Sequence, residues 1–122
     1  MPTPDPGEVC WNEYLASDTA AATAFYTGLF GWTADGMVGE SSGYTILKNG
    51  ITPAAGLTHT PAPGIPSHWL TYILVEDCAV SAAKAQALGG KILSGPTDIT
   101  PGRLAIVADP QGAVFGLFTP SR

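Results

Sequence analysis

Glu13 is the side chain that points most directly to chemistry, because it stands between Trp11 and Tyr14 in the predicted strand Val9–Ala16. A carboxylate among aromatic side chains on a sheet face can accept or deliver a proton, so Glu13 is our candidate for a general acid or base. A solvated glutamate at a sheet edge or a dimer contact is the structural alternative. The sequence leaves both interpretations open.

Two histidines, His59 and His68, flank the proline-rich segment Thr60–Ser67. Together with Glu13 they would supply the two-histidine, one-carboxylate ligand set of many metal sites. The spacing favours a simpler interpretation, two exposed histidines at the ends of a linker, because a flexible loop does not hold ligands as one rigid element does.

Tyr72 and the two cysteines have weaker claims to a role in chemistry. The Tyr72 phenol can hydrogen-bond an oxygen of a ligand, or it can be buried against a backbone carbonyl. Cys10 and Cys78 are expected to be free thiols, since two isolated cysteines do not make a disulfide framework. Cys78 opens a predicted helix, but no histidine accompanies it there to act as a base, so a nucleophilic thiolate is not supported.

The chain has the composition of one compact domain, with 122 residues of which 45% are hydrophobic and 12% charged. A net charge of −5 with only five Lys and Arg leaves no basic patch for nucleic acid or for an anionic membrane surface. No apolar run is long enough to span a membrane, and the start MPTPDPGEV has neither the basic nor the apolar region of a signal peptide. We therefore expect a cytoplasmic protein.

The elements that must position these side chains occur twice, because the sequence matches itself at an offset of 59 residues without a gap. The matched residues fall at predicted helix starts, helix ends and turns. They are Leu15 and Leu74, Asp18 and Asp77, Ala20 and Ala79, Ala24 and Ala83, Leu29 and Leu88, Gly31 and Gly90, Gly36 and Gly95, Gly43 and Gly102, and Ala54 and Ala113.

The first half is predicted to form a strand, a helix and three strands. Strand Val9–Ala16 is followed by Asp18 as an N-cap, and the Ala-rich helix Thr19–Phe30 ends at Gly31. The three further strands are expected near Trp32–Val38, Tyr44–Lys48 and Ala54–Thr58.

The second half repeats this order after the linker. Strand Trp69–Val75 is followed by Asp77 as an N-cap and by helix Cys78–Leu88. The further strands are expected near Lys91–Leu93, Arg103–Ala108 and Ala113–Phe118.

This order predicts an α+β fold of two tandem βαβββ modules, in which helices cover the outer face of curved mixed sheets and the other face forms a cup. We expect module 1 at about residues 8–59, the linker at about 60–67 and module 2 at about 68–120, within a single domain of residues 1–122.

A motif near the start of the chain resembles a known family. It comprises Cys10-Trp11-Asn12-Glu13-Tyr14-Leu15, Asp18, Ala22, Phe25-Tyr26 and Leu29-Phe30-Gly31-Trp32. It resembles the opening module of the vicinal oxygen chelate superfamily, which includes glyoxalase I, fosfomycin- and bleomycin-resistance proteins and extradiol dioxygenases. The run Asp109-Pro110-Gln111-Gly112 is similar to the turn before the last strand of that superfamily. The resemblance implies a homodimer and a cup that holds a small molecule.

Metal-dependent members of that superfamily carry His, Glu or Gln on the first and last strand of each module. The resemblance, with the offset of 59 residues, puts these positions at Trp11, Leu57, Leu70 and Gly116. None of these residues can ligate a divalent cation, which needs nitrogen, oxygen or thiolate donors. We therefore expect no metal and no cofactor.

Side chains two residues away from these positions face the same side of their strand. The resemblance therefore implies a cup with apolar and aromatic walls and a few polar groups, which is typical of small-molecule pockets. The residues expected to bind the ligand are Trp11, Leu57, His59, His68, Leu70, Tyr72, Val114, Gly116 and Phe118.

Two functions fit these expectations. The first is a glyoxalase/bleomycin-resistance-like protein that holds a hydrophobic or aromatic ligand without turnover. The second is a metal-independent isomerase, cyclase or lyase that uses Glu13 as its general acid or base, assisted by the Tyr72 phenol. A metal enzyme with shifted ligands is the least supported, and the fold alone does not choose between these functions.

Overall fold

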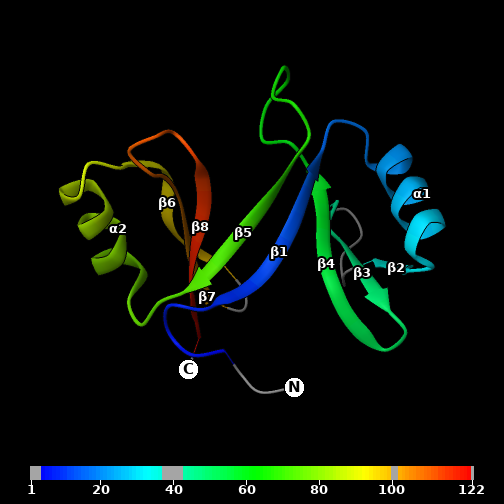
Figure 1. Cartoon of the computed structure of the whole chain (residues 1–122), viewed down its shortest axis with the longest axis horizontal. Helices are drawn as coiled ribbons and strands as arrows, with labels where there is room; N and C mark the ends of the chain where they lie inside the picture. The colour runs from blue at the N-terminus through cyan, green and yellow to red at the C-terminus, as the bar shows by residue number, and fades with distance from the viewer. Residues whose placement is uncertain (1–3, 37–42, 100–101, 122) are drawn as a thin grey trace. The chain divides into compact units, whose positions relative to one another are not determined.

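The computed structural model describes residues 4–36, 43–99 and 102–121. Its elements follow the order strand, helix and three strands, twice (Figure 1). They group into two compact units, a first unit, Trp11–Leu70, and a second unit that combines Met1–Cys10 with Thr71–Arg122. The predicted α+β fold of two βαβββ repeats is confirmed.

The strands of the first repeat form a mixed sheet. β1 (Val9–Ala16) pairs in parallel with β4 (Thr52–His59). β4 pairs in antiparallel fashion with β3 (Thr45–Asn49), and β3 does so with β2 (Thr33–Gly36). The end of the strand expected near Trp32–Val38 lies outside the described residues.

The second repeat has the same pairing pattern. β5 (His68–Leu74) pairs in parallel with β8 (Val114–Pro120). β8 is antiparallel to β7 (Gly102–Ala108), and β7 is antiparallel to β6 (Lys91–Ile99).

β6 is longer than the strand expected at Lys91–Leu93. Its pairing with β7 shifts register twice between Ile92 and Thr97. These irregularities leave Pro96 outside the ladder of paired residues, so its missing N–H costs no ladder hydrogen bond. The strand therefore continues past Leu93, the predicted end, and past Pro96 to Ile99.

Helix α1 (Thr19–Phe30) has the predicted ends. The Asp18 carboxylate accepts a hydrogen bond from the Ala21 N–H at 3.0 Å, which satisfies a free donor of the first turn. Gly31 ends the helix with a φ of 71°, in the left-handed region that glycine adopts without strain.

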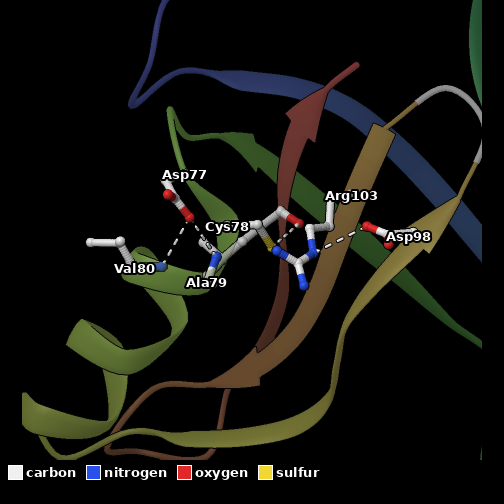
Figure 2. Close-up of polar contacts among 7 residues, drawn as sticks. Asp77, Cys78, Ala79, Val80, Asp98 and Arg103 are labelled. Carbon is white, nitrogen blue, oxygen red and sulfur yellow. Dashed lines mark hydrogen bonds and ion pairs between the residues drawn. The ribbon is translucent and has the colours of Figure 1, made fainter. Parts of the chain in front are cut away.

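Helix α2 (Cys78–Ala87) begins in the same way. The Asp77 carboxylate accepts hydrogen bonds from the N–H groups of Ala79 at 3.0 Å and Val80 at 3.2 Å (Figure 2). Each helix lies on one face of the strands of its own repeat, and the sheets are curved (Figure 1). Neither helix is long and apolar enough to cross a membrane, within the residues that the structure describes.

The two repeats bury their helices to different extents. In the second, Cys78 and Ala82 of α2 pack against Ala105, Val107 and Leu117 of the sheet. In the first, the buried side chains come from the strands, and α1 buries none of its own.

Candidate functional site

Three side chains of the first unit are joined by hydrogen bonds on one face of β1. The Trp11 Nε1–H donates to the Tyr44 hydroxyl at 3.0 Å, and the Tyr44 hydroxyl donates to Glu13 Oε2 at 2.9 Å. Trp11 and Glu13 are two residues apart on β1, so they face the same side, and Tyr44 comes from the segment directly before β3. We call these three residues the trio.

Gly56 of β4 provides the space that Tyr44 occupies. Glu13 and Gly56 are register partners in the parallel pair, so both face the same side of the sheet. A methyl group at position 56 would overlap the hydroxyl and the ring of Tyr44, and it would lie 3.1 Å from Trp11 Nε1. A side chain at this position would therefore displace the trio.

The electrostatics of the trio keep Tyr44 protonated. Burial raises the pKa of the Tyr44 hydroxyl above its ordinary value, and the nearby Glu13 carboxylate raises this pKa further. The hydrogen bond from Trp11 acts in the opposite direction and is outweighed. Tyr44 therefore donates a hydrogen bond to the Glu13 carboxylate and orients it. A carboxylate held in this way can anchor a polar group of a ligand or exchange a proton with it.

Leu57 and His59 do not join the trio. The register pairs them with Tyr14 and Ala16, which places both on the face opposite to Glu13. Leu57 is 1% exposed and belongs to the core, whereas His59 is exposed.

Leu57 and His59 were predicted on the wrong face because the two repeats differ by one residue in the spacing between their first and last strands. Glu13 and its partner Gly56 are 43 positions apart, whereas Tyr72 and its partner Gly116 are 44 positions apart. An ungapped offset therefore maps Gly116 onto Leu57, one residue beyond its structural counterpart. A slip of one residue along a strand moves a side chain to the other face of the sheet.

Residues predicted on the last strand share one face in the second repeat. Tyr72 and Gly116 are register partners, and Val114 and Phe118 lie two residues to either side of Gly116. Tyr72 is buried, and its ring occupies the place that a methyl group at Gly116 would take. Each repeat thus lays a tyrosine ring over a glycine of its last strand.

His68 and Leu70 precede Tyr72 on β5 by four and two residues, so the alternation of the strand puts all three on one side. Leu70 is buried. The Nδ1 atom of His68 lies 2.9 Å from the backbone oxygen of Pro66, which ties the imidazole to the linker.

Within residues 4–36, 43–99 and 102–121 no three His, Cys, Asp or Glu side chains come close enough to hold an ion, so Glu13, His59 and His68 do not assemble there as a shifted ligand set. With the register corrected, the positions that the resemblance implies for metal ligands hold Trp11, Gly56, Leu70 and Gly116. None of these offers a donor for a divalent cation.

Cys78 lies inside the second unit rather than in a reactive position (Figure 2). Its Sγ lies 3.8 Å from the Leu117 backbone oxygen. Burial raises the pKa of the Cys78 thiol, Arg103 opposes this shift, and Asp77 adds to it. Arg103 itself is paired with Asp98 at 3.2 Å. The thiol therefore remains protonated at neutral pH, as a core side chain would.

Comparison with known proteins assigns the chain to a family. The model of the Glyoxalase/Bleomycin resistance protein/Dioxygenase superfamily matches residues 11–117. One relative is CFP32 of Mycobacterium tuberculosis, which is named provisionally as a glyoxylase. It is 39% identical to this chain over 117 residues, which cover 94% of this chain and 45% of CFP32. The anthracycline biosynthesis protein DnrV of Streptomyces peucetius is 34% identical over 130 residues, which cover 93% of this chain and 47% of DnrV.

The fold of this chain is similar to that of methylmalonyl-CoA epimerase from Mycobacterium tuberculosis. The TM-score is 0.64 at 13% identity, over 93% of this chain and 88% of the epimerase. The chain spans about half the length of the curated relatives it matches. By the match over residues 11–117 and by these relatives, the chain belongs to the Glyoxalase/Bleomycin resistance protein/Dioxygenase superfamily.

Proposed function

We propose that this chain binds an aromatic or hydrophobic small molecule against the sheet face that carries the trio, without a protein-bound metal. The ring of Trp11 offers a surface on which a planar ligand can stack, and Glu13 with Tyr44 offers a polar anchor. The observation that carries the proposal is the hydrogen bond from Tyr44 to Glu13, because it gives a half-buried carboxylate one fixed direction.

The relatives support an aromatic ligand. DnrV is named for the biosynthesis of anthracyclines, which are planar aromatic compounds. An indole ring such as that of Trp11 gains from offset stacking with a planar ring system in addition to the area it buries.

The second repeat presents a surface of the same kind, and the proposal extends to it. Its residues share one face of the sheet in the second unit: Tyr72, Val114, Gly116 and Phe118. His68 and Leu70 remain ligand-binding candidates on the part of β5 that belongs to the first unit. Leu57 and His59 are left out, because their register directs them to the other face of their sheet.

A ligand screen with matched variants tests the proposal. The purified chain is melted in the presence of a panel of aromatic compounds that includes anthracyclines and simple quinones, since a ligand of the folded state raises the melting temperature. For a compound that binds, Tyr44→Phe should weaken the affinity about fivefold to tenfold, as expected for the loss of one hydrogen bond. Trp11→Ala should weaken it further.

The control for Tyr44→Phe is Tyr26→Phe. This variant also removes one tyrosine hydroxyl, which accepts a hydrogen bond from Trp69. Tyr26 contacts Tyr14, which lies on the face of the sheet opposite to Glu13, so the change is remote from the trio. Binding should be unchanged in this control. If no compound raises the melting temperature, or if Tyr44→Phe and Trp11→Ala bind as the natural chain does, the proposal is wrong.

A second candidate function is catalysis without a metal, with Glu13 as the general acid or base of an isomerase, cyclase or lyase. It is favoured by the position of the Glu13 carboxylate, which is half-buried, beside an indole and held by a phenol. Glu13→Gln should then abolish turnover of a bound compound and retain its binding, whereas the exposed Glu76→Gln should leave both unchanged. A compound that binds but is never turned over supports a binding protein instead.

We further propose that the chain works in the reducing environment of the cytoplasm. Cys10 and Cys78 are both free thiols, which suits such a compartment. Cell fractionation of the producing organism tests this location, and recovery of the protein in the culture medium would contradict it.

A further inference from the structure

The three side chains of the trio differ in the hydrogen bonds that they can make. The indole of Trp11 can donate but cannot accept, and the phenol of Tyr44 can do both. The Glu13 carboxylate can only accept. The trio therefore holds two polar hydrogens, one on Trp11 Nε1 and one on the Tyr44 oxygen.

Both of these hydrogens are used inside the trio. Because an indole cannot accept, Trp11 must be the donor in its 3.0 Å contact with the Tyr44 oxygen. The hydrogen of the Tyr44 hydroxyl then points to Glu13 Oε2, which lies 2.9 Å away. Burial and the Glu13 carboxylate both raise the pKa of Tyr44, so this hydrogen stays in place at neutral pH. The chemistry of the three groups thus fixes the direction of both bonds.

The Glu13 carboxylate is the acceptor at the end of these two bonds. A carboxylate has two oxygens with about four acceptor sites, and the bond from Tyr44 occupies one of these sites. Glu13 is half-buried, so part of its side chain is open to water. A ligand that contacts the polar atoms of the trio therefore meets acceptors, because both donors are already engaged.

The neighbouring side chains on this face do not change that balance. On β3, strand alternation puts Ile46 and Lys48 on the same side as Tyr44, and Ile46 is apolar. The ammonium group of Lys48 is bound to the Asp35 carboxylate at 2.8 Å. On β4, the Thr58 hydroxyl can donate or accept, so it favours neither kind of ligand. The preference is therefore set by Glu13.

We propose that the aromatic ligand of this face carries a hydrogen-bond donor, such as a phenolic hydroxyl, on the ring edge that meets Glu13. This ligand class narrows the binding function proposed above, on which it rests. A compound whose oxygens are all ethers or carbonyls is expected to bind poorly. Its oxygen would displace water from the carboxylate without replacing the hydrogen bond, and two acceptors would face each other.

Matched pairs of ligands test this proposal. Each hydroxylated compound that binds is compared with its own methyl ether, beginning with naphthol and the methoxynaphthalene of the same substitution. Isothermal titration calorimetry measures both dissociation constants. The hydroxylated compound should bind at least about tenfold more tightly, as expected for a hydrogen bond to a charged acceptor.

Glu13→Gln shows whether this preference comes from the carboxylate. Glutamine has nearly the same shape, but its amide brings two hydrogens to the place of an acceptor oxygen. Both compounds should still bind, and the ratio of their dissociation constants should fall to about one or below. A preference that arose from the bulk of the added methyl group would instead persist in this variant. The control is Glu76→Gln, which makes the same change at an exposed residue of the second unit and should keep the natural ratio.

Tyr44→Phe provides a second variant that should lower the ratio. Without the tyrosine hydroxyl, the Trp11 N–H loses its acceptor inside the trio and can donate to an ether oxygen of the ligand. Circular dichroism verifies that each variant is folded. The comparison of naphthol with its methyl ether on the natural chain needs no variant, so it decides the matter even if both variants unfold.

Two results would overturn the proposed ligand class while the binding function stands. One is a set of methyl ethers that bind as tightly as their parent hydroxyl compounds or more tightly. The other is a preference for the hydroxyl that is unchanged in Glu13→Gln. A panel in which no compound binds would instead overturn the binding function itself, and the ligand class with it.

Discussion

Gly56→Ala replaces only one hydrogen by a methyl group, yet it should destabilise the protein strongly. The added carbon would overlap the hydroxyl and ring of Tyr44, so this side chain must leave its place between Trp11 and Glu13. Forcing a group into a filled space costs about 1–3 kcal/mol, and the two lost hydrogen bonds add about 1 kcal/mol each. The lower backbone entropy of the unfolded alanine variant returns about 0.4–1 kcal/mol.

The net loss is about 3 kcal/mol of unfolding free energy, which lowers the melting temperature by roughly 10 °C for a domain of this size. Urea denaturation followed by circular dichroism measures it. Gly28→Ala is the control, because a methyl group there meets nothing within 4 Å and alanine favours the helix. This control should be as stable as the natural chain or more stable.

A double-mutant cycle identifies the cause of the loss. Tyr44→Ala removes the group that the new methyl would strike, so Gly56→Ala should cost much less in that background, with a coupling on the order of 1–2 kcal/mol. If Gly56→Ala alone changes the unfolding free energy by less than about 0.5 kcal/mol, or if the two changes add, the account of the trio is refuted.

The unfolding free energy should fall as the pH rises above 10.0, the ordinary pKa of tyrosine. The reason is that folding raises the pKa of Tyr44, so the folded state binds this proton more tightly than the unfolded state does. If the Tyr44→Phe variant lost as much unfolding free energy over the same pH range, this explanation would be wrong. Asp77→Ala should cost about 1 kcal/mol in urea denaturation, since two N–H groups lose their acceptor, and an unchanged midpoint would show that the cap is dispensable. Cys10, which is half-buried, should react with a thiol reagent before Cys78, which reacts only on unfolding; rapid reaction of the Cys10→Ser variant would show that Cys78 is accessible.

Much of the fold could be predicted because its signals are local. The bounds of β1 and α1 match the expected Val9–Ala16 and Thr19–Phe30, since Asp18 and Gly31 set the helix ends by short-range hydrogen bonding and backbone geometry. β6 was harder to predict, because a proline normally ends a strand and only the irregular register with β7 carries the strand past Pro96.

The candidate site could be predicted only in part. Trp11 and Glu13 follow from strand alternation, but Tyr44 reaches Glu13 across 31 residues of sequence, and no local pattern indicates that contact. The space at Gly56 was also missed, because the ungapped repeat assigned its place to Leu57. A gap of one residue in the repeat would have aligned Gly56 with Gly116, the two glycines that lie under tyrosine rings.

NMR of the tryptophan indoles tests most directly whether a ligand binds beside Trp11. The chain has three tryptophans, so the Nε1–H signals of Trp11, Trp32 and Trp69 can be assigned by single substitution. On titration with a compound that raises the melting temperature, the account predicts that the Trp11 signal shifts while the other two stay in place. A titration that moves the Trp69 signal and leaves Trp11 unchanged would contradict it.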